Sequence, residues 1–197
     1  MIRSARLLAV VVIVACGAIG VISSTQTWLT AVLDDGVGHA LEVPGASAIP
    51  VLAPLSLAVL ALGAALSIVG LVLRYVFGVL SVLIGLTLAW LSAHVAFGHP
   101  VSAVASVVTE STGIAGESSV ADLVASITAT PWPGITLATS VVLVAAGAFT
   151  LAGARRWAAT GRRYRTDEST HAATGGSRPH DAIDDWDDLS RGEDPTT

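Results

Sequence analysis

Four long apolar segments, none of which contains Asp, Glu, Lys or Arg, constrain this chain more strongly than any other feature. They cover residues 7–23, 51–73, 75–95 and 135–153. A helix of roughly 20 apolar residues crosses the hydrocarbon core of a bilayer, which is about 30 Å thick. The sequence therefore predicts an all-α membrane protein, with a bundle of four transmembrane helices in residues 1–157 and a flexible, disordered acidic tail in residues 158–197.

The arginines predict how the chain is threaded through the membrane. Two precede the first span, Arg74 lies between the second and third, and the others follow the fourth, whereas residues 24–50 and 96–134 contain no basic residue. Positively charged loops remain in the cytoplasm. We therefore expect a multi-pass plasma-membrane protein whose two termini and Arg74 hinge are cytoplasmic. The net charge of −5 is divided between two compartments, so it gives no indication of nucleic-acid binding.

The two long loops outside the membrane have different patterns. Residues 27–33 are rich in strand formers, residues 34–38 favour a turn, and residues 39–43 could return as a second strand, which together predict a short β-hairpin. In the second loop, residues 100–110 and 119–128 place valine, leucine and isoleucine at helical spacing. These two segments are predicted to be amphipathic helices that lie against the bilayer or cap the bundle.

Four of the five tryptophans fall near the ends of the predicted spans. Because tryptophan prefers the boundary between headgroups and acyl chains, we interpret these four as membrane-interface anchors: Trp28, Trp90, Trp132 and Trp157. Small residues also recur at four-residue steps, as in Cys16 and Gly20, Gly63 and Ser67, Ser81 and Gly85, and Ala148 and Ala152. Such steps favour close helix packing within one chain or in a homo-oligomer.

Cys16 permits a second interpretation of the first span. Residues 13–16 match the pattern before a lipidated cysteine, but residues 17–22 stay apolar, where a lipoprotein would continue into a polar linker. A retained transmembrane helix is therefore the preferred interpretation, and lipidation of Cys16 is the alternative.

The sequence carries no recognisable pattern for catalysis or cofactor binding. The spans offer hydroxyl groups but almost no ionisable ones, which disfavours an ion-coupled transporter. Four residues of the hairpin could converge on a metal, although a solvated polar turn is the preferred interpretation: Asp34, Asp35, His39 and Glu42. The pair His94 and His99 has no distinctive spacing. We expect no enzyme activity, no metal site and no cofactor.

The acidic tail holds the fifth tryptophan, which the membrane boundary does not explain. Three apolar residues stand at three-residue steps among aspartates: Ile183, Trp186 and Leu189. An aromatic anchor of this kind is typical of a linear motif that docks on a partner. The predicted binding segment continues through Arg191, Gly192, Asp194 and Pro195.

Thr27-Trp28 after the first span, the arginine-free loops and the ending DDWDDLSRGEDPT at 184–196 carry a family resemblance. The chain resembles the tryptophan-biosynthesis-associated membrane proteins of actinobacteria. The resemblance implies an integral plasma-membrane protein usually encoded beside tryptophan-synthesis enzymes, with no established activity and no family site residues to transfer. It leaves two hypotheses: a non-catalytic scaffold whose tail docks a cytosolic partner, or a small oligomeric facilitator for tryptophan or a related aromatic metabolite.

Overall fold

The computed structural model describes residues 2–34 and 38–158, with side chains from residue 7 to residue 153 apart from the gap at 35–37. All of these residues belong to one unit, residues 1–159. The tail beyond it, including the flexibility predicted for it, lies outside the described residues.

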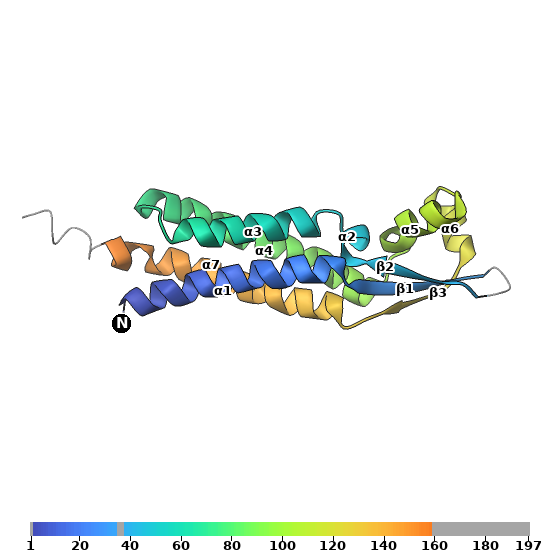
Figure 1. Cartoon of the computed structure of the whole chain (residues 1–197), viewed down its shortest axis with the longest axis horizontal. Coiled ribbons are helices and arrows are strands. Elements are labelled where there is room, and N and C mark those ends of the chain that lie inside the picture. Colours follow the sequence, from blue (N-terminus) through green and yellow to red (C-terminus); the bar gives the residue numbers. More distant parts are fainter. Residues whose placement is uncertain (1, 35–37, 159–197) are drawn as a thin grey trace, which may run out of the picture. The chain divides into compact units, whose positions relative to one another are not determined.

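Four helices run side by side and form the bundle (Figure 1). They are α1 (Ile2–Thr25), α3 (Leu52–Leu66), α4 (Leu71–Gly98) and α7 (Trp132–Ala158). Helix α4 packs along α7, and α1 packs against both α3 and α7, whereas α3 and α4 touch little. Within the described residues, α1, α4 and α7 are long and apolar enough to cross a membrane. Helix α3 has only 15 residues, a length of roughly 22 Å, so the predicted count of four spans stays a prediction.

The helices pack through narrow stripes of buried residues whose spacing alternates between four and three. On α3 the stripe is Leu52, Ser56, Val59, Gly63 and Leu66, and on α4 it is Arg74, Gly78, Ser81, Gly85, Leu88, Ser92 and Val95. A repeat of 3.5 residues is the pattern of left-handed coiled coils. The contact between α4 and α7 is close because each helix places a glycine against the other: Gly85 on α4 and Gly147 on α7. A β-carbon added at Gly85 would lie 2.8 Å from Val144, and one added at Gly147 would lie 2.9 Å from Val82.

The turn between α3 and α4 differs from the prediction. We expected Arg74 to form the hinge between two spans, but α3 ends at Leu66 and α4 begins at Leu71, so the hinge is four residues earlier. Arg74 lies in the first turn of α4, with only 6% of its surface exposed, and its guanidinium donates a 3.4 Å hydrogen bond to the Val69 carbonyl. Val69 lies in the turn between α3 and α4, so this hydrogen bond to a backbone carbonyl partly offsets the cost of burying the charge.

A three-stranded antiparallel sheet extends from one end of the bundle (Figure 1). Its strands are β1 (Thr27–Leu33), β2 (Ala40–Pro44) and β3 (Val124–Ala129), in the order β2-β1-β3. The hairpin of β1 and β2 confirms the sequence prediction. The helix predicted over 119–128 is wrong in its second half, because α6 (Glu117–Leu123) ends where β3 begins. The free edge of β1 supplies backbone partners for β3, and this long-range pairing overrides the local helical spacing.

One face of the sheet is covered by protein. Helix α5 (Ser102–Thr112), which confirms the helix predicted over 100–110, buries Val104 and Val108 in a core shared with Leu29 and Val43 of the sheet. Val120 of α6 joins the same core. The apolar face of α5 therefore packs against the sheet and is not the membrane-contacting face that we considered. The short helix α2 (Gly45–Ala48) links β2 to α3.

Candidate functional site

The predicted partner-binding motif lies outside the described residues. This applies to Ile183, Trp186, Leu189, Arg191, Gly192, Asp194 and Pro195. The structure therefore leaves this motif as a prediction, and the candidate sites that it can place are the tryptophans, the interior of the bundle and the hairpin.

Trp28 is the largest side chain that the described residues bury completely, with 0% of its surface exposed. It stands three residues after the end of α1 and is the second residue of β1, at the junction between bundle and sheet. We predicted an anchor in the membrane boundary, but a side chain with no exposed surface cannot contact lipid. We therefore correct this assignment: Trp28 is a core residue.

The indole N–H of Trp28 is the centre of a buried polar network. It donates to the Ser23 carbonyl at 2.9 Å and to Ser23 Oγ at 3.0 Å. Ser23 Oγ in turn lies 2.6 Å from Thr136 Oγ1, which joins α1 to α7. Gly45 closes the site, since a β-carbon there would lie 2.6 Å from the indole nitrogen. Four elements, α1, β1, α2 and α7, are thereby fixed around one ring.

The other predicted anchors are placed differently. Trp90 on α4 has 76% of its surface exposed, which is compatible with a position in the membrane boundary. Trp132 is half-buried against the core of the sheet. Trp157 is in the last turn of α7, and its side chain lies outside the described part. An anchoring role stays a prediction for these three residues.

The interior of the bundle holds a small cavity whose exposed lining is mostly apolar. Its volume is about 10 Å³, and its polar lining comes from Ser56, Thr136, Thr139 and Ser140. Such a volume suffices for about one water molecule. The hydroxyls of Ser56 and Ser140 donate to backbone carbonyls one turn earlier, at 2.7 and 2.8 Å, so they are satisfied without a ligand. The cavity is too small for an amino acid or a similar metabolite.

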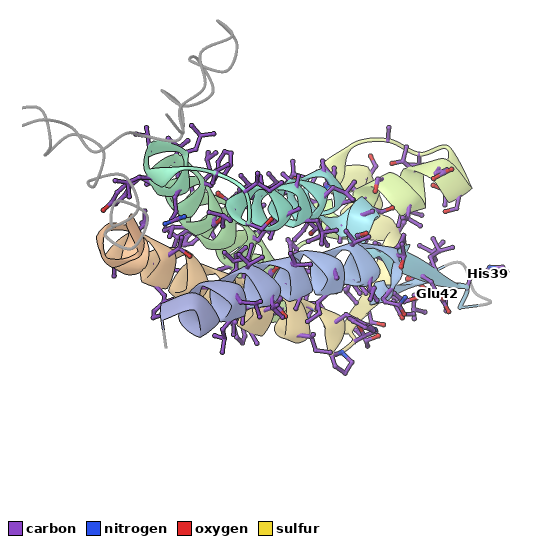
Figure 2. The ribbon with its side chains drawn as sticks, turned by 60° about the vertical axis from the view of Figure 1, so that its left-hand side comes forward. His39 and Glu42 are labelled. Carbon is purple, nitrogen blue, oxygen red and sulfur yellow. The ribbon has the colours of Figure 1, made fainter. Side chains whose placement is uncertain are left out.

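The hairpin does not assemble the metal ligands that we considered. Among the described residues, no three of the side chains His, Cys, Asp and Glu come together, and Asp35 lies outside those residues. Figure 2 shows His39 nearer the tip of the hairpin than Glu42. Glu42 instead accepts a 3.0 Å hydrogen bond from Thr27 Oγ1 across the strands, which is the ordinary arrangement of a polar sheet face.

Sequence reasoning missed Ser23, Thr136 and Gly45 as parts of the tryptophan junction. Ser23 and Thr136 are separated by 113 positions along the chain, and no local pattern relates them. Gly45 directly follows β2, and a glycine at the end of a predicted hairpin is ordinary turn chemistry, so its contact with the indole could not be read from the sequence.

Comparison with known families gives a match over nearly the whole chain. A family described as tryptophan-associated transmembrane protein matches residues 10–196. The chain belongs to this family. The resemblance inferred from the sequence is thus confirmed. The matched residues include both Trp28 and the acidic segment. No curated protein and no solved structure matches the chain.

Proposed function

We propose that the protein is a non-catalytic scaffold of the plasma membrane, whose bundle holds the C-terminal tail at the cytoplasmic face. The observation that carries this proposal is the packed interior. The cavity between α1, α3, α4 and α7 has room for about one water molecule, and the middle of each described spanning helix lacks charged side chains. Between the described side chains of these four helices this cavity has no room for a metabolite, so we assign the docking interaction to the tail that leaves the bundle.

The tail is the segment with the clearest docking chemistry. The family match extends to residue 196, so the acidic segment belongs to the shared sequence of the family. Ile183, Trp186 and Leu189 provide the apolar anchors, and the aspartates between them favour a partner with a basic groove. Because aromatic anchors dominate many interfaces, Trp186 is the residue on which binding should depend most.

The test compares three forms of the full-length protein in detergent: wild type, Trp186→Ala, and Ser177→Ala as a matched control in the linker. Each form captures proteins from the cytosol, and any candidate is then purified and tested for direct binding. We expect a partner that binds wild type and Ser177→Ala equally and binds Trp186→Ala at least tenfold more weakly, on the order of a hot-spot loss. Recovery of the same partners with equal affinity by Trp186→Ala would refute the docking proposal.

An oligomeric facilitator for an aromatic metabolite is the second candidate. One observation favours it: Ala138, Ala145, Ala148 and Ala152 face outward on α7, where small residues permit close association of helices from several copies. A passage would then lie between copies and not within one. Labelled-tryptophan flux into proteoliposomes decides between the two, because a scaffold gives the rate of empty vesicles and a facilitator gives a faster one.

A further inference from the structure

An open groove lies where the bundle meets the sheet-covering helices, between the start of α3, the end of α4 and the start of α5. Its volume is about 220 Å³. Figure 1 shows α2 beside this meeting point, between α3 and α5. The walls are mostly apolar, with Ile49, Leu91 and Val95 among them, and the polar side chains of the lining are His94 and Ser102.

Exposed apolar side chains adjoin the groove. Val51, part of its lining, has 44% of its surface exposed, and Trp90 and Phe97 on α4 have 76% and 79% exposed. His94 lies between these two aromatic residues at helical spacing and is itself exposed. The apolar lining of the groove is therefore continuous with the apolar outer face of α4, which is one of the helices able to cross a membrane.

His94 is unusual because it is an ionisable residue within an exposed apolar stripe. Ionisable groups in membrane-spanning segments are costly and generally serve a function. His94 lies four residues before Gly98, the last residue of α4. The end of a 28-residue apolar helix reaches beyond a hydrocarbon core of about 30 Å and lies at headgroup level. An imidazole at this depth can donate a hydrogen bond to a phosphate oxygen.

We propose that this groove binds one membrane phospholipid, with a segment of an acyl chain along Ile49, Leu91 and Val95 and the phosphate beside His94. This site is independent of the proposed docking by the tail. A phospholipid combines the two chemistries of the lining. Its acyl chain can pack against the apolar walls, and its phosphate can accept hydrogen bonds from the His94 imidazole and the Ser102 hydroxyl. The volume is smaller than the roughly 300 Å³ of typical pockets for small molecules, which limits the site to a segment of one acyl chain beside the phosphate.

The test measures lipid retention by the full-length protein with native mass spectrometry in detergent. Three probes are added separately: phosphatidylglycerol, diacylglycerol, which lacks the phosphate, and inorganic phosphate, which lacks the chain. Ala48→Phe fills the groove, because Ala48 is part of its lining. Ala61→Phe makes the same substitution on the exposed face of α3 and is the matched control.

We expect wild type and Ala61→Phe to retain one phosphatidylglycerol per chain and Ala48→Phe to bind it at least tenfold more weakly. His94→Leu should weaken phosphatidylglycerol roughly tenfold, as expected for one lost hydrogen bond to a charged group, and leave diacylglycerol unchanged. Equal retention by Ala48→Phe and Ala61→Phe would overturn the groove as the site. Equal affinity of wild type for diacylglycerol and phosphatidylglycerol, or displacement of the lipid by inorganic phosphate, would also overturn the proposal.

The result does not depend on the folding of Ala48→Phe. Val51→Trp narrows the mouth of the groove from an exposed position, and His94→Leu alters an exposed side chain, so both variants should keep the thermal unfolding midpoint of the wild type. Loss of phosphatidylglycerol from Val51→Trp supports the proposal, and wild-type retention by it contradicts the proposal.

Discussion

Trp28 combines two contributions at one residue: its ring fills the space between the bundle and the sheet, and its N–H satisfies buried acceptors of Ser23. Removing the N–H while keeping an aromatic ring would take one donor from both acceptors. The Ser23 carbonyl would keep the Gln26 N–H at 3.2 Å and Ser23 Oγ would keep Thr136 Oγ1 at 2.6 Å, so the loss is that of one buried hydrogen bond. Complete burial therefore distinguishes Trp28 from Trp90, which is mostly exposed, and from Trp132, which is half-buried.

Trp28→Phe should lower the free energy of unfolding by about 2–3 kcal/mol, the sum of a lost hydrogen bond and a smaller ring. Trp90→Phe is the matched control, because Trp90 is mostly exposed and should change the value by less than about 0.5 kcal/mol. Denaturant titration in detergent measures both. Equal losses for the two variants would show that Trp28 does not have the structural role assigned to it.

The sequence correctly predicts that Trp28 follows the first helix, but it does not predict that the side chain is buried. Proximity to a span predicts the membrane boundary for any tryptophan, and Trp90 and Trp28 look alike by that criterion. Burial of Trp28 depends on Ser23, Thr136 and Gly45, which come from three different elements. Only the three-dimensional fold brings them together.

At the scale of elements, α1 and α3 approach each other through glycines. A β-carbon added at Gly17 would lie 2.8 Å from the Leu60 backbone nitrogen, and one added at Gly20 would overlap the Ser56 hydroxyl. The steps at Cys16 and Gly20 and at Ser81 and Gly85 are buried as expected. In contrast, Ala148 and Ala152 face outward. The four-residue spacing of small residues thus predicted helix-packing surfaces on α1 and α4 correctly, but on α7 it did not predict which face packs inside the bundle.

Gly20→Ala should destabilise the protein by about 1–3 kcal/mol, because the added methyl group forces Ser56 and the two helices apart. Gly134→Ala is the control, since nothing lies within 4 Å of the position that its β-carbon would take. Thermal unfolding in detergent compares the two. A Gly20→Ala variant as stable as Gly134→Ala would mean that α1 and α3 are less closely packed than described.

The third strand can be tested by its register. Thr30 of β1 and Thr128 of β3 are directly paired, and opposed residues of antiparallel strands have Cα atoms about 4.5–5.5 Å apart, within the range of disulfides. In a Cys16→Ala background, Thr30→Cys/Thr128→Cys should form a disulfide under mild oxidation. Thr30→Cys/Ala125→Cys should not, because three residues of strand add roughly 10 Å. Equal cross-linking of both pairs, read from gel mobility, would contradict the strand.

At the scale of the whole molecule, the apolar spans could be predicted better than the segments between them, and the tail stays a prediction because it lies outside the described residues. Apolar runs follow directly from bilayer thickness, and α1, α4 and α7 agree with them within a few residues. The boundary near Arg74 could not be predicted, because a charge normally ends a span and here it lies inside α4, bonded to the Val69 carbonyl of the preceding turn. Strand β3 depends on partners about 100 residues away, which no local spacing reveals.

The orientation of the molecule gives the last prediction. The arginines lie at one end of the bundle and after it, whereas the sheet segments at 24–50 and 96–134 contain none, so the sheet should face away from the cytoplasm. In a Cys16→Ala background, a membrane-impermeant maleimide should label Thr128→Cys in intact cells, because Thr128 is on the exposed face of the sheet. Ser177→Cys in the tail should react only after the cells are broken. The cysteine-free chain sets the background, and the reverse labelling pattern would place the tail outside and exclude a cytosolic partner for it.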